Sequence, residues 1–376
     1  MIIETIEFSN FRNYVSEATV FHEKVNIITG KNAQGKTNLI EAINLLSMGK
    51  SFRTRKESEM IRFGEVSCLV KGMFLKQGRP YGTAVELRVN GHGGGSGSGH
   101  GGGGKAHTYF VNGAEMLSVA DILGGVYTVV FSPEDLRIVK GEPEVRRRFL
   151  DRGLILLRPL YYHKLKQYRA VLKSRNALLK AERVSIDLID IYDEQLAAAG
   201  AAVMEERFRH TSALSAAAKR ADAMLTDEKE SIEIGYRPNI AAEKAEDAKE
   251  IFGETLRRGR ERDLLMKSTE AGPHRDDLSL VVDGKDLRTY GSQGQQRTAA
   301  IALRLAEKEL VRQETGEEAI LLLDDVMSEL DADRQGRLLE RFGANQIFVT
   351  AAVLDEKAAA ALGAVKFIRI EEGKVI

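Results

Sequence analysis

The sequence predicts an α/β fold in which a mixed β-sheet core is interrupted by one short helical insertion. Short β-type runs alternate with turn residues over residues 1–150 and return over residues 265–376. Residues 151–264 contain few such runs and are rich in Ala, Leu, Lys, Arg and Glu, most of which favour helices. The length of 376 residues, with 43% hydrophobic and 29% charged residues, suits two or three globular domains.

Charge and composition exclude several classes of protein. Because 55 Lys and Arg residues balance 55 Asp and Glu residues, the chain is no uniformly basic coat for nucleic acid, although a local basic face remains open. The single cysteine, Cys68, cannot form an intrachain disulfide. No apolar run approaches the ~20 residues that span a bilayer, and the start of the chain, MIIETIEFSNF, lacks the basic residues of a signal peptide. We therefore expect a cytoplasmic protein without a membrane partner.

Residues 1–150 form the N-terminal part of the expected sheet core. A segment with ten glycines in fourteen positions, residues 91–104, predicts a flexible loop whose flanks have the pattern of two hairpin strands. Two origins of this loop stay open, a natural low-complexity segment and an engineered linker. The strands expected in this part are Ile2–Phe8, Val25–Thr29, Cys68–Leu75, Thr83–Val89 and Tyr127–Phe131.

A phosphate-binding loop follows the strand Val25–Thr29. Its pattern is G-x-x-x-x-G-K-[ST], and a helix with Leu39, Ile43 and Leu46 on one face comes directly after it. Lys36 is expected to reach the β- and γ-phosphates and the Thr37 hydroxyl to ligate Mg²⁺. The loop consists of Gly30, Lys31, Asn32, Ala33, Gln34, Gly35, Lys36 and Thr37.

A nucleotide site of this kind also needs an acidic residue at the end of another buried strand. The apolar run Ile320–Leu323 is typical of a central parallel strand, and it ends in Asp324 and Asp325. We expect Asp324 to hold Mg²⁺ and Asp325 to polarise the attacking water. A solvated turn is the alternative for two adjacent Asp residues, but it does not explain the apolar run before them.

Residues 151–264 predict a short helical arm. Apolar residues recur there at helical spacing in three stripes. Each helix holds about 30 residues, or ~45 Å at 1.5 Å per residue. The stripes are Tyr161, Leu165, Tyr168, Leu172 and Leu179; then Leu196, Ala199 and Val203; then Leu214, Ala217, Ala221 and Leu225.

Residues 265–376 form the C-terminal part of the expected sheet core. The strands expected there are Leu278–Val282, Ala319–Leu323, Gln346–Thr350 and Lys366–Ile370. A small polar turn around Ser292 precedes a helical run, and a helix N-terminus of this kind can bind an anion. The phosphate loop, this S-x-G-Q turn, the paired Asp residues and the S-x-L-D of residues 328–331 together resemble the ATP-binding-cassette ATPases. The resemblance implies an ATP-dependent homodimer in which Ser292, Gly294 and Gln295 close over the nucleotide that the partner holds.

Other segments indicate which branch of the ATP-binding-cassette ATPases the chain resembles. The start IEFSNFRNY at residues 6–14 resembles the N-terminal strand of the chromosome-maintenance and DNA-repair branch of these ATPases. In that branch the Arg of this strand approaches the nucleotide, which implies the same role for Arg12. GKSFR at residues 49–53, FSPEDL at 131–136, VKG at 139–141 with RRRFLD at 146–151, and AGPHRDDL at 271–278 look like the RecF family. This resemblance covers nearly the whole chain.

Membership of that family implies a particular function. It implies a weak, DNA-stimulated ATPase with ATP and Mg²⁺ as cofactors. It implies binding to duplex DNA and to junctions of single and double strands, with RecO and RecR proteins as partners. The corresponding roles are recombinational repair of gapped DNA, replication restart and the SOS response.

Three departures from the wider cassette pattern affect the chemistry. Ser132-Pro133-Glu134 stands where cassette ATPases place a Gln, so the metal contact of that loop is in doubt. Asp325 stands where many have Glu, and Phe348–Ala352 lacks the usual switch His. A shortened base and a missing His predict slow hydrolysis, which suits a timed switch better than a motor.

His274 lies beside Asp276 and Asp277 and has two interpretations. One is a metal or acid–base site, and the other, which we favour, is a cluster that organises the loop before a hairpin with Asp283-Gly284 as its turn.

Basic residues at the arm give modest support for DNA binding, although basic helix faces are commonly plain solvated surface. No single residue is assigned to a base or a phosphate. The residues are Arg146, Arg147, Arg148, Arg152, Arg158, Lys164, Lys166, Arg169, Lys173, Arg175, Arg257, Arg258, Arg260 and Arg262.

Two further classes compete with this assignment. A transporter ATPase subunit would have a membrane-docking surface and a His after the last core strand, and the helical insertion disfavours it. A structural chromosome organiser needs an arm of hundreds of residues, whereas residues 151–264 supply far fewer.

Overall fold

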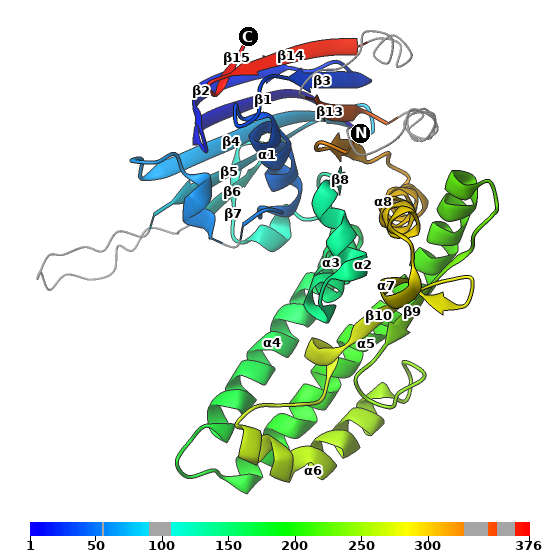
Figure 1. The fold of residues 1–376 in the computed structure, drawn as a ribbon. Coiled ribbons are helices and arrows are strands. Elements are labelled where there is room, and N and C mark those ends of the chain that lie inside the picture. The colour runs from blue at the N-terminus through cyan, green and yellow to red at the C-terminus, as the bar shows by residue number, and fades with distance from the viewer. Residues whose placement is uncertain (55, 90–106, 327–344, 352–364) are drawn as a thin grey trace, which may run out of the picture. The chain divides into compact units, whose positions relative to one another are not determined.

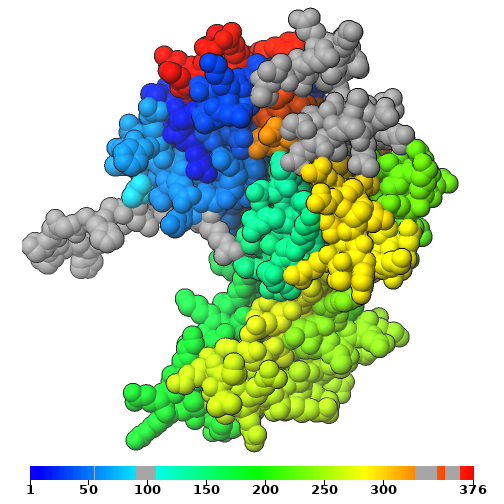
Figure 2. Space-filling model, in the orientation of Figure 1, coloured from blue at the N-terminus to red at the C-terminus, as the bar shows by residue number. Residues whose placement is uncertain are grey.

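The computed structural model describes residues 1–54, 56–89, 107–326, 345–351 and 365–376. The chain forms two compact units, Met1–Pro133 with Thr315–Ile376, and Glu134–Glu314. The first unit is coloured mainly blue, cyan and red in Figures 1 and 2, and the second mainly green and yellow. The Gly-rich segment 91–104 and the S-x-L-D at 328–331 lie outside the described residues. Among the residues that are described, no helix is long and apolar enough to cross a membrane.

The unit boundaries differ from the predicted ones. The sequence placed the arm at residues 151–264, whereas the second unit begins at Glu134 and ends at Glu314. The reason is the packing of its core, which draws in Ile138 and Phe149 from before the predicted arm and Leu278 and Leu303 from after it. Composition separated helix-rich from strand-rich sequence, but a compact unit is defined by what packs together.

The described residues of the first unit form two six-stranded sheets. One is antiparallel, with the order β2-β1-β4-β5-β6-β7. The predicted hairpin around the Gly-rich segment is confirmed, because Leu87 pairs with His107 and Thr83 with Val111. Its strands are β1 (Ile2–Phe11), β2 (Tyr14–Val20), β4 (Ser67–Lys76), β5 (Arg79–Arg88), β6 (His107–Val111) and β7 (Ala114–Met116).

The other sheet carries the phosphate loop. Its order is β15-β14-β3-β13-β12-β8, parallel throughout except for the last hairpin, so the predicted mixed core is confirmed. Strands β8, β12 and β13 are buried at every position, which explains their largely apolar sequences. Its strands are β3 (Val25–Thr29), β8 (Thr128–Phe131), β12 (Ile320–Leu323), β13 (Ile347–Ala351), β14 (Val365–Glu371) and β15 (Lys374–Val375).

Helix α1 (Lys36–Met48) contacts strands of both sheets. The sequence predicted one apolar face, but the helix is buried on most of its circumference, polar residues included. The buried Asn44 donates to the Thr128 hydroxyl (2.8 Å) and the buried Ser47 to the Val126 carbonyl (2.8 Å). These bonds satisfy side chains that would otherwise be costly to bury.

The second unit is helical around one small sheet. The second and third predicted stripes belong to one continuous helix, α5, whose 41 residues exceed the expected length. Strand β9 was not predicted, and it pairs with β10 along its whole length. The elements are α2 (Leu136–Lys140), α3 (Pro143–Leu157), α4 (Pro159–Leu179), α5 (Ile186–Thr226), β9 (Ile232–Arg237), α6 (Ala248–Met266), β10 (Asp277–Val282), β11 (Lys285–Asp286), α7 (Leu287–Tyr290) and α8 (Gln293–Thr315), with short 3₁₀ turns at Glu57–Met60, Val119–Asp121, Pro133–Asp135 and Pro273–Arg275 in the chain as a whole.

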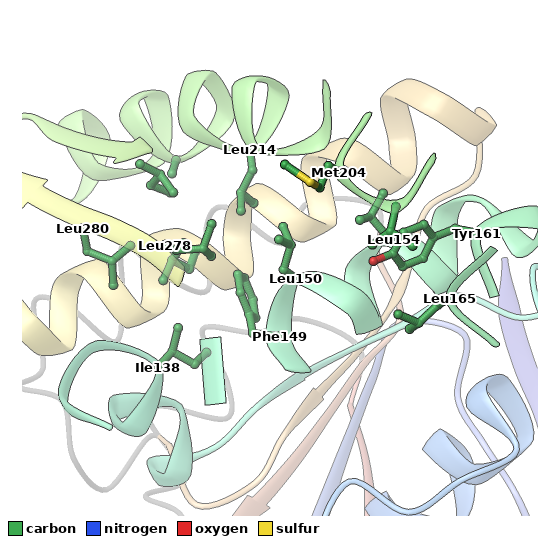
Figure 3. Close-up of a cluster of buried hydrophobic side chains, with 14 of the residues drawn as sticks. Ile138, Phe149, Leu150, Leu154, Tyr161, Leu165, Met204, Leu214, Leu278 and Leu280 are labelled. Atoms are coloured by element: carbon green, nitrogen blue, oxygen red, sulfur yellow. The ribbon is translucent and has the colours of Figure 1, made fainter. Parts of the chain in front are cut away.

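The core of the second unit joins helices to the β9–β10 sheet. Figure 3 shows Phe149 and Leu150 of α3 together with Leu278 and Leu280 of β10 and Leu214 of α5. The predicted turn after β10 is confirmed by positive φ at Asp283 (49°) and Gly284 (76°), the combination that a tight two-residue hairpin requires.

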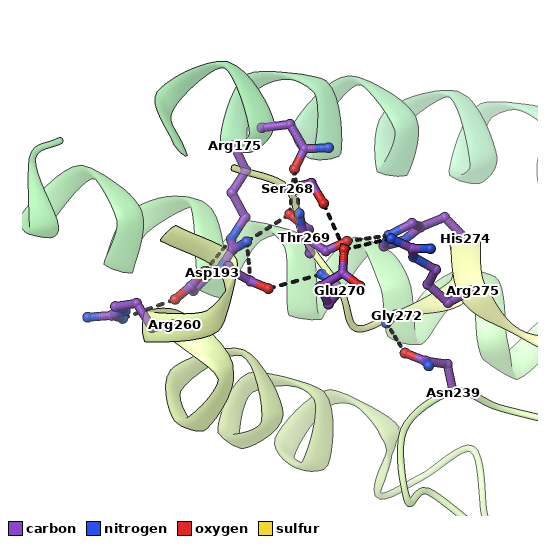
Figure 4. Close-up of polar contacts among 12 residues, drawn as sticks. Arg175, Asp193, Asn239, Arg260, Ser268, Thr269, Glu270, Gly272, His274 and Arg275 are labelled. Carbon is purple, nitrogen blue, oxygen red and sulfur yellow. Dashed lines mark hydrogen bonds and ion pairs between the residues drawn. The ribbon is translucent and has the colours of Figure 1, made fainter. Parts of the chain in front are cut away.

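Buried ion pairs brace the arm helices. Arg175 of α4 has no exposed side-chain surface and donates to Asp193 of α5 (2.6 Å) and Asp263 of α6 (2.7 Å) (Figure 4). In the same way Arg207 donates to Asp151 (2.8 Å) and Asp276 (3.0 Å). Removing one partner of such a pair costs about 3–5 kcal/mol, so these contacts fix how the helices pack within the unit.

His274 has the contacts of a structural residue. Its Nε2 bonds the Thr269 carbonyl (2.9 Å), so Nε2 carries the hydrogen and Nδ1 accepts from the Tyr168 hydroxyl (2.6 Å). Within the described part of the chain, no group of three or more His, Cys, Asp or Glu residues could hold a metal ion. These contacts favour the loop-organising interpretation over a metal site.

The first prediction concerns acid sensitivity. Burial lowers the pKa of His274 from 6.5 to about 4, so the unfolded chain binds a proton more readily than the folded protein between these pH values. The free energy of unfolding should therefore fall as the pH drops through this window. His274→Asn keeps a donor and an acceptor but cannot titrate, and it should reduce the loss between pH 7 and 4.5 by about 2 kcal/mol. Urea denaturation at the two pH values measures this, with the exposed His163→Asn as control. Equal acid sensitivity in the two variants would contradict the assignment.

Candidate functional site

The phosphate loop turns sharply from β3 into α1. Gly30, Ala33 and Gly35 have positive φ values of 147°, 64° and 121°, which lead the chain directly into a helix that begins at Lys36. Among the described residues, no side chain caps this helix and none in its first turn is acidic. Its N-terminal amide groups and the positive end of its dipole therefore suit an anion.

The turn between β1 and β2 holds the loop in place. Asn13 Nδ2 donates to the Gln34 carbonyl (2.7 Å), and the Tyr14 hydroxyl donates to the Gly35 carbonyl (2.9 Å). Gly35 has a φ of 121°, which residues with a Cβ rarely adopt, and a Cβ there would also press on the Asn13 side chain at 2.9 Å, so the position favours glycine. The sequence did not assign these roles to Asn13 and Tyr14, because the contacts join residues about twenty positions apart.

Lys36 and Thr37 occupy the first turn of α1. The Lys36 ammonium lies across the loop and donates to the carbonyls of Gly30 (2.6 Å) and Lys31 (3.1 Å). The Thr37 hydroxyl donates to Asp324 Oδ1 (2.9 Å). The structure thus brings together the two residues for which the sequence predicted a shared Mg²⁺ ion, and both offer the oxygen ligands that this ion prefers.

Asp324 and Asp325 have different environments. Asp324 is buried and also accepts from the Thr350 hydroxyl (3.1 Å). Burial raises its pKa, and the hydrogen bonds from the two threonines offset part of the rise. Asp325 is exposed and has the left-handed φ of 57°, a conformation that Asp tolerates better than most residues. The pair therefore divides into one enclosed carboxylate beside Thr37 and one that faces solvent.

Thr350 belongs to the segment Phe348–Ala352, for which the sequence predicted that the switch His of many cassette ATPases is missing. Its hydroxyl donates to Asp324 and accepts from the Asp325 amide (2.9 Å), so it fixes both acidic residues. The sequence pattern indicated only that a His is missing from this segment. A threonine at the end of a buried strand was the available signal.

Arg12 is engaged with α1. Its guanidinium forms a two-pronged ion pair with the fully buried Glu41 (2.8 and 2.6 Å) and donates to the Glu59 carbonyl (2.6 Å). Arg53 and Ser51 bond the same carboxylate. The structure shows Arg12 fixing α1 to the end of β1, and its expected approach to a nucleotide stays a prediction.

The predicted S-x-G-Q turn around Ser292, called the signature turn below, forms the N-terminus of α8 in the second unit. Ser292 Oγ accepts from the Gln295 amide (3.2 Å), and Gln295 Oε1 accepts from the Ser292 amide (2.9 Å). This reciprocal pair is a capping box. Ser292 is exposed, and Gly294 adds no side chain to the first helical turn. The predicted residues Ser292, Gly294 and Gln295 therefore share one preorganised turn.

The basic residues of the arm are mostly paired inside their own unit. Arg175 is wholly buried, Arg146 forms a two-pronged pair with Asp277, and Arg147 donates to the Asp276 carbonyl. Their clustering in the sequence therefore reflects internal bracing more than a free basic face, and the charge argument for DNA contact is weaker than expected. Further pairs join Arg148 to Glu144, Arg158 to Glu206 and Glu314, Lys164 to Glu206, Arg169 to Asp151, Arg258 to Glu254, and Arg260 to Asp190 and Asp193.

Comparison with known proteins agrees with this geometry. The family model described as RecF/RecN/SMC N terminal domain matches residues 2–371. The DNA replication and repair protein RecF of Alkaliphilus oremlandii is 39% identical over 94% of each chain, and that of Oceanobacillus iheyensis is 38% identical over 100% of each.

Solved structures give the same result. The recombination mediator protein RecF-ATP in the RecFOR pathway has a TM-score of 0.89 and 36% identity, covering 100% of this chain and 97% of its own. The Smc head domain of Pyrococcus furiosus, at 17% identity and a TM-score of 0.56 over 100% of this chain and 96% of its own, shares the fold. The phosphate loop, the paired acidic residues and this full-length similarity together place the chain in the RecF family.

Proposed function

We propose that the chain binds ATP with Mg²⁺ at Gly30–Thr37 and hydrolyses it slowly, as an ATP-dependent DNA-binding switch in DNA repair. One observation carries this proposal. The hydrogen bond between Thr37 and Asp324 joins the phosphate loop to the end of β12 and sets two oxygen ligands side by side. The RecF structure named above, which is described with ATP, supports ATP as the ligand.

Each residue of the site would have a separate role in binding and hydrolysing ATP. Lys36 would exchange its two carbonyl partners for the β- and γ-phosphates. Thr37 and Asp324 would hold Mg²⁺, which would supply positive charge against the phosphates when bound. Asp325 would orient the attacking water and accept its proton, while Thr350 keeps both acidic residues in place. A carboxylate one methylene shorter than Glu is consistent with slow turnover.

ATP is proposed to drive dimerisation. The capping box at Ser292 holds a helix N-terminus ready for an anion, and the cassette resemblance assigns that anion to the γ-phosphate of the partner subunit. DNA, both duplex and junctions of single and double strands, is the proposed second ligand and would stimulate the weak ATPase. RecO and RecR proteins are the proposed partners, in the cytoplasm, during gap repair, replication restart and the SOS response.

The second prediction tests the dimer. Ser292→Arg places a bulky cation at the turn and should leave ATP binding intact while blocking dimerisation. Lys36→Ala should abolish ATP binding, and dimerisation with it. Equilibrium sedimentation with and without ATP, repeated with duplex and gapped DNA, measures both effects. Normal ATP-dependent dimers of Ser292→Arg would refute the shared site.

The third prediction tests the base. Asp325→Asn keeps the shape of the side chain and tolerates the left-handed φ, so the variant should still bind ATP. Loss of a positioned base typically costs ~10²–10⁴-fold in rate, so turnover should fall by that factor and the dimer should persist longer. The control is Asp283→Asn, another Asp with positive φ (49°), in the β10–β11 turn. Unchanged turnover in Asp325→Asn would move the base elsewhere, with Glu134 the next residue to test.

A further inference from the structure

We propose that the turn between β14 and β15, Glu372-Gly373, is a positioning element of the nucleotide site that holds the phosphate loop in its binding conformation. The proposal deepens the proposed ATP binding and rests on it. The turn lies more than 330 positions along the chain from the loop, and nothing in its composition marks it as part of a nucleotide site.

Gln34, in the middle of the loop, is the point of contact. Its carbonyl accepts from the Gly373 amide (3.1 Å) as well as from Asn13 Nδ2 (2.7 Å). Its side-chain Oε1 accepts from the Glu372 amide. The peptide between Ala33 and Gly35, both at positive φ, is therefore held from two sides at once.

The strand before the turn also touches the loop. β14 runs parallel to β3, with Arg369 level with Thr29, so Ile370 continues alongside Gly30 where the loop begins. A Cβ on Gly30 would lie 2.3 Å from the Ile370 carbonyl oxygen. Main chain meets main chain here, which leaves room for glycine alone at position 30.

The residues that follow the turn bond to β2 and to β14. The Val375 amide donates to Glu17 Oε2 (3.1 Å), and the Ile376 amide donates to the Arg369 carbonyl (2.9 Å). A Cβ on Gly373, whose φ is +74°, would lie 2.3 Å from the Asn13 carbonyl oxygen. The turn, the Asn13 region and the loop thus form a closed set of contacts.

This arrangement has a physical consequence for the loop. Gly30 and Gly35 reach positive φ without a Cβ to clash, but Ala33, at φ 64°, is strained and keeps this conformation only where surrounding contacts determine it. Asn13 and Tyr14 supply such contacts on one side, and Glu372 and Gly373 supply them on the other. Loosening the turn should allow the loop to leave the conformation that binds phosphate while the sheets stay folded.

A pair of matched glycine variants tests the proposal in the full chain. Gly78, in the β4–β5 turn, has nearly the same φ (+71°) as Gly373, but nothing lies within 4 Å of a Cβ built on it. Gly78→Ala and Gly373→Ala therefore carry the same backbone strain, and only Gly373→Ala also pushes against Asn13. A fluorescent ATP analogue with Mg²⁺ gives the Kd, and thermal unfolding without nucleotide gives the stability.

We expect both variants to have a lower melting temperature than the wild type. Only Gly373→Ala should also weaken nucleotide binding, by about tenfold or more, and a tenfold change corresponds to 1.4 kcal/mol. A purely structural role for the turn would lower the melting temperature, more in Gly373→Ala than in Gly78→Ala, and leave both affinities at the wild-type value, which would overturn the proposal. Failure of the wild type and Gly78→Ala to bind ATP would instead refute the proposed function.

A second comparison decides the matter if Gly373→Ala does not fold. Glu17→Ala removes the acceptor of the Val375 amide, whereas Glu17→Gln keeps an oxygen that can accept the same bond. We expect weaker ATP binding in Glu17→Ala and wild-type affinity in Glu17→Gln. Equal affinities in these two variants would overturn the proposal.

Discussion

The hydrogen bond from Thr37 to Asp324 is the contact on which the rest of the nucleotide site depends, and sheet topology makes it possible. β3 and β12 both pair in parallel with β13, so their carboxyl ends meet at one edge of the sheet. Leu323 and Ile27 are both level with Val349 of β13. Asp324 therefore emerges close to the place where the loop leaves β3, although the two segments are nearly 300 positions apart. Thr350, the next residue of β13, then binds both acidic residues at that edge.

A different constraint shapes the second unit, where buried arginines join motifs that are distant in sequence. Asp151, from the RRRFLD segment, and Asp276, from AGPHRDD, share the buried Arg207 of α5, while Arg146 from the first segment pairs with Asp277 from the second. Because an unpaired buried charge costs several kcal/mol, each segment requires the other. The segments that carry the resemblance to the RecF family therefore also stabilise the fold of the second unit. Their ion pairs connect α3 to the residues at the start of β10, the strand that precedes the turn around Ser292.

Local sequence patterns were sufficient to predict much of the first unit and of the phosphate loop. The spacing of glycines around Lys36 predicted the phosphate loop, and the apolar run before Asp324 predicted a buried strand that ends in an acidic residue. Both predictions depend on residues that are neighbours in the sequence. Contacts made by tertiary packing left no such signal. The ion pair of Arg12 with Glu41, the continuity of α5, strand β9 and the role of Gly373 all depend on segments that meet only in the folded chain. Charge was the least informative signal, since a row of arginines looks the same whether its partners are phosphates or internal carboxylates.

The most direct test of the proposed Mg²⁺ site is a double-mutant cycle of Thr37→Val and Asp324→Asn, with ATP affinity measured in Mg²⁺ and in EDTA. If the two side chains hold one ion together, each variant removes the same Mg²⁺-dependent part of the binding. The double variant should then lose little more than either single variant, with a coupling energy of at least about 1 kcal/mol in Mg²⁺ and almost none in EDTA. Losses that simply add, or that are equal in Mg²⁺ and in EDTA, would contradict a site that the two residues share.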